Sequence, residues 1–303
     1  MPLPRAHGFF LPVPGGERYC LYHAPATGGT PRGAWLHVHA FAEEMNKSRR
    51  MAALQARAFA AAGHAVLQID LHGCGDSSGD FSDARWETWH DDLERARQWL
   101  AQRHSMPPGV WGTRLGGLLA LDFATHATTP VDDVLLWQPV LNGEQFMTQF
   151  LRIRMAADMM GQDEAIAPAT PSGTGTGGIR PAADGKAPAA TVTTQSLRAA
   201  LSAGDSLEIG GYLLAPQLAG AIDRCRLAGL GRPGLRVHWF EVVSETGRGL
   251  PPAAATVAAA LREKGVALQV HLAQGAPFWS SQEIVEAPEL LGATLAITDG
   301  VAA

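Results

Sequence analysis

A strand-turn-helix pattern at residues 109–124 could hold a catalytic group. The stretch GVWGTRLGGLLALDFA begins as an apolar strand ending near Trp111, passes through a tight Gly-x-x-x-Gly turn and enters a helix of small residues. This is the layout of a nucleophile elbow, in which the residue between the two glycines is the attacking serine. Here Arg114 stands between Gly112 and Gly116. A guanidinium stays protonated and only donates hydrogen bonds, so serine catalysis at this position is excluded.

The loop after the third expected strand carries charges where an oxyanion loop is normally small and glycine-rich, so that backbone N–H groups can meet developing negative charge. Its sequence, HVHAFAEEMNKSRRM, places Glu43 and Glu44 at the start of a helix. Two interpretations remain open. The acids could lie at a solvated helix terminus, where they favour the dipole. Alternatively, one of them reaches Arg114, because a buried guanidinium needs a carboxylate or an anionic ligand.

The remaining partners of a Ser-His-Asp triad are not clearly present. Glu245 follows the expected strand LRVHWFEVV and is available as the acid. The base should follow the last strand, but Pro277 and Phe278 occupy that place. His271 lies inside the strand, where we expect a core or sheet histidine. With both nucleophile and base absent from their places, the pattern indicates a different kind of site.

Two further groups of side chains near these loops could react or bind. Cys74, in the loop DLHGCGDSSGD, is the one thiol near the site, and we expect it to line the pocket more readily than to act as a nucleophile. His37 and His39 alternate on one strand and, with Asp70 and His72, could be imagined as metal ligands. Only the His-x-His spacing fits, so no metal site and no cofactor are predicted. The weak catalytic candidates are Glu43, Glu44, Cys74 and Glu245.

The elements that position these residues alternate between strand and helix after an antiparallel start. Apolar segments bounded by turns predict strands at residues 7–13, 18–25, 33–41, 64–71, 109–112, 132–140, 235–243 and 266–272. Amphipathic or apolar segments predict helices at 46–63, with Asn46 as cap, at 86–103, after the elbow, at 251–265 and from about Ser280. This order predicts a mostly parallel twisted sheet, with antiparallel N-terminal strands and helices on both faces.

The alternation breaks after Leu141, where an insertion begins. We divide the chain into a core of residues 1–141 and 231–303 and a cap insertion of 142–230. The cap opens with a helical segment rich in phenylalanine and methionine, and these side chains could cover a ligand or only pack the cap on the body. The Gly/Pro/Ala/Thr-rich stretch at about 162–194 contains few large apolar residues, so we expect a disordered loop there.

Composition limits the classes of function. The formal charge of −5 and the absence of a Lys/Arg run argue against a nucleic-acid partner. The three cysteines, Cys20, Cys74 and Cys225, are far apart and fit a reduced compartment. No signal-peptide core and no apolar run long enough to span a bilayer is present, so we expect a cytoplasmic protein without a transmembrane segment.

Four segments together resemble a known family: FAEEMNKSRRM, WGTRLGGLLAL, GDSLEIGGYLL and GAPFWSSQEI. They are similar to the second of two α/β-hydrolase-like proteins associated with the exosortase A system, found in bacterial loci for exopolysaccharide production and for sorting of proteins with a C-terminal anchor signal. The resemblance covers most of the chain apart from the 162–194 stretch. It implies an α/β-hydrolase fold with a cap, an arginine at the elbow as part of the family pattern, and exopolysaccharide or exosortase-system proteins as possible partners.

Three functions remain open. The first is a non-catalytic or atypical site for an anionic or acyl small molecule, with Arg114 as a clamp. The second is a hydrolase or acyl-transfer enzyme of the ester or thioester class, with a relocated nucleophile or an activated water. The third is a structural partner in exopolysaccharide assembly, in which an Arg-Glu pair is closed. The candidate ligand-binding residues are His39, Phe41, Glu43, Glu44, Arg114, Leu115 and Trp279.

Overall fold

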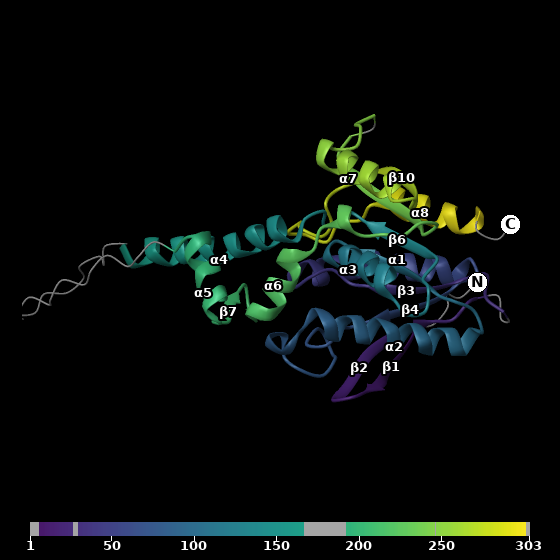
Figure 1. The fold of residues 1–303 in the computed structure, drawn as a ribbon, viewed down its shortest axis with the longest axis horizontal. Helices are drawn as coiled ribbons and strands as arrows, with labels where there is room; N and C mark the ends of the chain where they lie inside the picture. The colour runs from purple at the N-terminus through teal and green to yellow at the C-terminus, as the bar shows by residue number, and fades with distance from the viewer. Residues whose placement is uncertain (1–5, 27–29, 167–191, 246, 301–303) are drawn as a thin grey trace, which may run out of the picture.

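An eight-stranded sheet forms the centre of the protein (Figure 1). The computed structural model describes residues 6–26, 30–166, 192–245 and 247–300. The strand order is β1-β2-β4-β3-β5-β6-β9-β10, with β1 and β2 antiparallel and the others parallel to one another. The strands are β1 (Ala6–Val13), β2 (Gly16–His23), β3 (Ala34–Val38), β4 (Ala65–Ile69), β5 (Gly109–Thr113), β6 (Asp133–Trp137), β9 (Arg236–Val243) and β10 (Ala267–Gln274).

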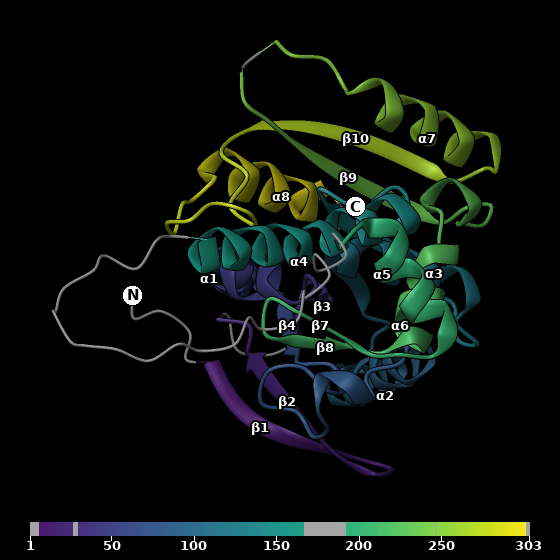
Figure 2. The ribbon, with the colours of Figure 1, turned by 90° about the vertical axis from the view of Figure 1, so that its left-hand side faces the viewer.

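Helices cover both faces of this sheet, as the sequence predicted (Figure 2). One face carries α1 (Glu43–Ala61) and α8 (Pro288–Gly300), and the other carries α2 (Trp86–His104), α3 (Leu115–His126) and α7 (Pro252–Glu263). Because both faces are covered, every residue of β3 and of β5 is buried. Short 3-10 turns, η1 (Phe81–Asp83) and η2 (Leu227–Gly229), complete the connections.

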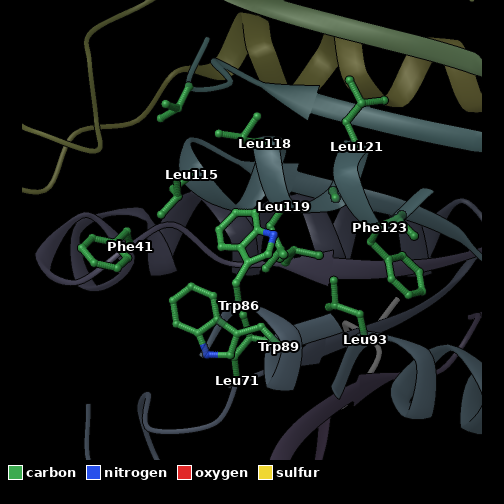
Figure 3. Close-up of a cluster of buried hydrophobic side chains, with 14 of the residues drawn as sticks. Phe41, Leu71, Trp86, Trp89, Leu93, Leu115, Leu118, Leu119, Leu121 and Phe123 are labelled. Atoms are coloured by element: carbon green, nitrogen blue, oxygen red, sulfur yellow. The ribbon is translucent and has the colours of Figure 1, made fainter. Parts of the chain in front are cut away.

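The packing between α2 and α3 shows how the elbow helix is held (Figure 3). Trp86, Trp89 and Leu93 of α2 share one buried cluster with the leucines of α3. Phe41, from the loop after β3, lies in the same cluster and is 3% exposed. The start of α3 is therefore fixed by apolar burial on the side away from α1.

The cap follows β6 and extends away from the sheet (Figure 1). It consists of α4 (Gly143–Ile166), α5 (Thr194–Ala203), the hairpin β7 (Leu207–Ile209) and β8 (Tyr212–Leu214), and α6 (Pro216–Arg224). Phe146, Met147 and Phe150 of α4 are buried against the body, whereas Met159 is 54% exposed further along the helix. Part of the Phe/Met-rich face therefore packs the cap on the core.

Three sequence predictions about element boundaries need correction. Helix α1 begins at Glu43, three residues before Asn46, and follows Ala42 at φ 50° with no side-chain cap. The last helix begins at Pro288, well after Ser280. Of the stretch 162–194, α4 continues to Ile166 and Thr193 caps α5, while 167–191 lies outside the described residues. Within the described ranges, every helix is too short or too polar to span a bilayer.

Candidate functional site

The elbow predicted at residues 109–124 is present as a tight turn between β5 and α3. Gly112 and Gly116 are required by close packing, because a Cβ on Gly112 would lie 2.3 Å from the carbonyl oxygen of Gly116 and one on Gly116 would lie 2.2 Å from that of His39. Arg114 has φ 57° and ψ −119°, a backbone conformation that residues other than glycine rarely adopt. Its N–H donates to the Trp137 carbonyl at 2.9 Å, which ties the turn to the neighbouring strand.

The Arg114 side chain is paired with Glu44. Its Nη2 lies 3.0 Å from Glu44 Oε1, and its Nε lies 3.3 Å from both carboxylate oxygens. Nη1 donates to the main-chain carbonyl of Gln138 at 3.2 Å. The two side chains are 15% and 22% exposed, so the pair is mostly removed from water. Of the two open interpretations of the acidic loop, the structure supports the one in which a carboxylate reaches Arg114.

A tryptophan covers the guanidinium on the side from which a catalytic histidine normally approaches. Trp279 comes from the loop after β10, and the guanidinium carbon of Arg114 lies 5.0 Å from its ring centroid. Phe278, the preceding residue, is 1% exposed and packs on Trp137. An indole accepts no proton from a nucleophile but attracts a cation through its ring face. The position next to the elbow therefore stabilises the arginine and carries no general base.

Behind the arginine lies a network that the sequence analysis did not identify. The Gln138 amide donates to Glu241 at 2.8 Å and accepts from the Val242 N–H at 2.7 Å. The Trp239 indole N–H donates to the other oxygen of Glu241 at 2.9 Å. Burial raises the pKa of Glu241, whereas its two hydrogen bonds and Arg114 act in the opposite direction. Glu241, and not the exposed Glu245, is thus the acid of the β9 strand nearest to the elbow.

The two acids at the start of α1 have different surroundings. Burial raises the pKa of Glu44, and Arg114 opposes that shift. Glu43 is exposed and accepts hydrogen bonds from Asn46 at 3.0 Å and from Tyr212 of the cap at 3.4 Å. Glu44 therefore belongs to the elbow, whereas Glu43 joins the helix terminus to the cap hairpin.

A cleft lies between the cap and the loop that follows β3, with a cavity volume of about 130 Å³. We call it the cap cleft. Aromatic and aliphatic side chains form most of its wall, and two carboxylates and one amide complete it; the lining residues are Phe41, Glu43, Glu44, Phe146, Gln149, Phe150 and Ile153. Phe41 meets Phe146 and Phe150 edge-on, with ring centroids 5.7 and 5.1 Å apart. Of the residues predicted to bind a ligand, Phe41, Glu43 and Glu44 line this cleft.

The loop His39–Ala42 and the first residue of α3 enclose a much smaller space of about 10 Å³. The N–H groups of Phe41 and Leu115 make no hydrogen bond with other described residues. In a nucleophile elbow, the N–H after the nucleophile and one from the loop after the third strand bind the oxyanion, and these are the corresponding positions. The His39 ring is fixed, because Nδ1 lies 2.7 Å from the Ala40 carbonyl and Nε2 accepts from the Leu71 N–H at 3.2 Å. His39 therefore shapes the loop.

The structure gives little support to the other weak candidates. Cys74 lines the small space beneath the loop, but burial and the nearby Asp70 raise the pKa of its thiol, so it lacks the thiolate needed for attack. Glu245 is exposed beyond the end of β9. Across the described parts of the chain, no group of three His, Cys, Asp or Glu side chains is arranged to hold a metal ion.

The sheet order, the helices on both faces and the elbow define the α/β-hydrolase fold. A family model described as serine aminopeptidase, S33, matches residues 29–170, a little under half of the chain, including the acidic loop and the elbow. No curated protein sequence matches the chain significantly.

Solved structures with the same fold include two proteins with bound small molecules. Est1E from Butyrivibrio proteoclasticus with bound ferulic acid is 13% identical, with a TM-score of 0.60 over 97% of both chains. A monoglyceride lipase variant from Saccharomyces cerevisiae, in complex with a substrate analog, is 13% identical, with a TM-score of 0.59 over 99% of this chain and 96% of the lipase. At this identity the likeness establishes the fold alone.

Proposed function

We propose that this α/β-hydrolase-fold protein is a non-catalytic binding protein that holds an acyl ligand in the cap cleft. The observation that carries the proposal is the closed contact between Arg114, Glu44 and Trp279 at the place where a nucleophile and its base would stand. A site without a nucleophile or a general base cannot perform serine-hydrolase chemistry. The neighbouring cleft nevertheless keeps the apolar walls suited to an acyl chain.

The same contact argues against an anion as the ligand. Arg114 already donates to both oxygens of Glu44 and to the carbonyl of Gln138. The charged groups that line the cap cleft are Glu43 and Glu44, and Arg114 is not among its lining residues. An incoming carboxylate or phosphate would face two carboxylates in a cleft that no lysine or arginine side chain lines. Of the anionic and acyl ligands expected, the acyl ligand fits better.

The apolar part of the cleft supports this choice. Phe41, Phe146 and Phe150 are each less than 9% exposed, whereas Ile153 at the rim is 49% exposed. A ligand can bury the exposed apolar surface of such a rim residue. Burial of apolar surface contributes about 25 cal/mol of binding free energy per Å². The Gln149 amide offers a donor and an acceptor to a neutral ester or amide group.

A role in the exosortase A and exopolysaccharide system is part of the proposal and rests on the resemblance. The four segments that carry it supply the residues of one site. Arg114 and its two contacts, Glu44 and Trp279, come from three of them. Tyr212, which donates a hydrogen bond to Glu43, comes from the fourth. The resemblance therefore concerns the site itself and not only the scaffold. A cytoplasmic location belongs to the same proposal.

The test is binding of two pyrene-labelled probes of equal length, a fatty acyl amide and a fatty acid, followed by fluorescence. We expect the amide to bind more tightly than the acid. Ile153→Asp should weaken it at least tenfold, because a charge replaces apolar rim area. Leu213→Asp is the control, since Leu213 is similarly exposed at 44% but does not line the cleft. Tighter binding of the acid would favour an anionic ligand held by Arg114. If neither probe binds, a structural partner in exopolysaccharide assembly would be the better explanation.

One observation favours an active enzyme as the second candidate. The strained elbow and the unbonded N–H groups of Phe41 and Leu115 preserve the arrangement that stabilises an oxyanion. Release of pyrene alcohol from an acyl ester by the wild-type protein, with loss of turnover in Glu44→Gln or Cys74→Ala, would favour this candidate. Absence of turnover together with amide binding would support the binding protein.

A further inference from the structure

A second cavity lies on the opposite side of the His39–Ala40 loop, between α1 and the sheet, and has a volume of about 160 Å³. We call it the α1 pocket. Its walls come from β2, β3, β4 and the segments that follow them, and from one face of α1. It shares only His39 and Ala40 with the small space beneath the elbow and no residue with the cap cleft. It is therefore a separate space.

The pocket arises from the residues on two facing surfaces. Leu21, Gln68 and His37 are direct neighbours across β2, β4 and β3, so they form one row on the sheet. Helix α1 lies over this part of the sheet (Figure 2). The α1 residues that line the pocket are spaced three to four apart and so share one helix face; they are Met45, Ser48, Arg49, Ala52 and Ala53. Because Ser48, Ala52 and Ala53 are small, the helix face does not fill the space above the row.

Polar groups inside the pocket lack partners. Ser48 is 4% exposed, and its hydroxyl makes no hydrogen bond in the described part of the protein. His37 is also 4% exposed; its Nε2 lies 3.3 Å from Thr113 Oγ1, and no described residue bonds its Nδ1. A buried hydroxyl without a partner destabilises the folded state, so such groups normally bond a ligand or an ordered water.

The charges around the pocket balance one another. Arg49 Nη2 lies 3.4 Å from Asp70 Oδ2, and the same oxygen accepts from the Asp76 N–H at 3.1 Å. Burial lowers the pKa of His37 to about 3, so its ring is neutral. The other lining side chains are uncharged: Tyr19, Ser48 and Gln68 are polar, burial lowers the pKa of His39, and the rest are apolar. A neutral molecule therefore suits the pocket better than an ion.

We propose that the α1 pocket binds a neutral, ring-sized organic molecule with one hydroxyl group, such as a phenol, whose hydroxyl bonds Ser48. The volume supports this size, because an engineered apolar cavity of about 150 Å³ binds benzene. The hydroxyl of Ser48 can both donate and accept, and so can that of a phenol. The proposal does not depend on the ligand of the cap cleft.

The experiment is titration of the full-length protein with phenol, followed by the methyl signals of its eight methionines in ¹³C NMR. Met45 lines the pocket, and its signal is assigned from its absence in Met45→Leu. We expect a saturable shift of the Met45 signal. Toluene, which lacks the hydroxyl, should bind about threefold to tenfold more weakly, the fold-change of one hydrogen bond. Benzoate should not compete.

Two helix variants decide the location. Ala53→Leu places a larger side chain in the pocket and should abolish the Met45 shift, whereas Ala61→Leu adds the same side chain at the exposed end of α1 and should leave it unchanged. Ser48→Ala should reduce phenol affinity to that of toluene. Any of three results would overturn the proposal: the Met45 methyl signal does not shift at millimolar phenol, its shift persists in Ala53→Leu, or benzoate binds more tightly than phenol.

Discussion

The elbow and the α1 pocket lie on either side of the same loop and differ in whether their buried polar side chains have partners. At the elbow, Arg114 is surrounded by Glu44, the Gln138 carbonyl and the Trp279 ring. In the α1 pocket, the hydroxyl of Ser48 has no hydrogen-bond partner among the described residues and lies beside a cavity. The side chain at the position of the nucleophile is thus fully paired, whereas a buried side chain of the pocket behind the loop is not.

The largest effect that tests this comparison is expected from Arg114→Ala. The substitution leaves Glu44, whose pKa burial already raises, without its cation. We expect a loss of about 2–4 kcal/mol in the free energy of unfolding, at the lower end of the cost of breaking a buried pair because both side chains keep some exposure. Urea unfolding followed by tryptophan fluorescence measures it. Adding Glu44→Gln to Arg114→Ala should recover part of the loss.

Arg50→Ala is the matched control for this measurement. Arg50 lies on α1, as Glu44 does, and pairs with Glu286, but the two side chains of this pair are 55% and 38% exposed. An exposed pair contributes about 0–1 kcal/mol. Equal effects of Arg114→Ala and Arg50→Ala would show that the elbow pair is not structural, and the arginine would again be a candidate for ligand contact.

A smaller effect is expected from Glu241→Gln, and its dependence on pH is the informative part. Burial raises the pKa of Glu241, so the folded state holds its proton at pH values where the unfolded chain, with a pKa of about 4.3, has lost it. The stabilisation from Glu241 is therefore complete at low pH and declines as pH rises through the raised value. The stability advantage of the wild-type protein over Glu241→Gln should therefore fall as pH rises above about 4.3 in urea titrations. A rising advantage would contradict the raised pKa, because it would mean that the hydrogen bonds and Arg114 outweigh burial at Glu241.

The sequence predicted the sheet, the elbow and the arginine on it, because these follow from apolar periodicity and glycine spacing. It left open whether Glu44 reaches Arg114, since a loop's path is not encoded in its composition. It did not identify the Gln138–Glu241 contact, which depends on Gln138 at φ 43° directing its backbone towards the elbow. The polar cap expected at Asn46 was wrong because α1 starts from a strained Ala42.

The α1 pocket could not be predicted for a related reason. A cavity is a property of two surfaces, and neither the small residues of α1 nor the row of Leu21, Gln68 and His37 indicates alone that the space between them stays open. Sequence periodicity assigns Ser48 to a buried helix face, where a serine is unremarkable. Only the distances show that its hydroxyl has no partner.

The smallest expected effect compares two buried serines near this pocket. Ser77 donates to the Asp70 carbonyl and accepts from the Tyr19 N–H at 2.9 Å, so Ser77→Ala should cost about 1–2 kcal/mol. Ser48 has no partner and lies inside a helix, so Ser48→Ala should leave stability unchanged or raise it by about 0.5–1 kcal/mol through relief of the unpaired hydroxyl and the better helix propensity of alanine. Paired urea titrations at one pH resolve the difference. A loss of 1 kcal/mol or more in Ser48→Ala would mean that the hydroxyl is bonded by ordered water in the free protein, and the contrast between a satisfied elbow and an unsatisfied pocket would no longer hold.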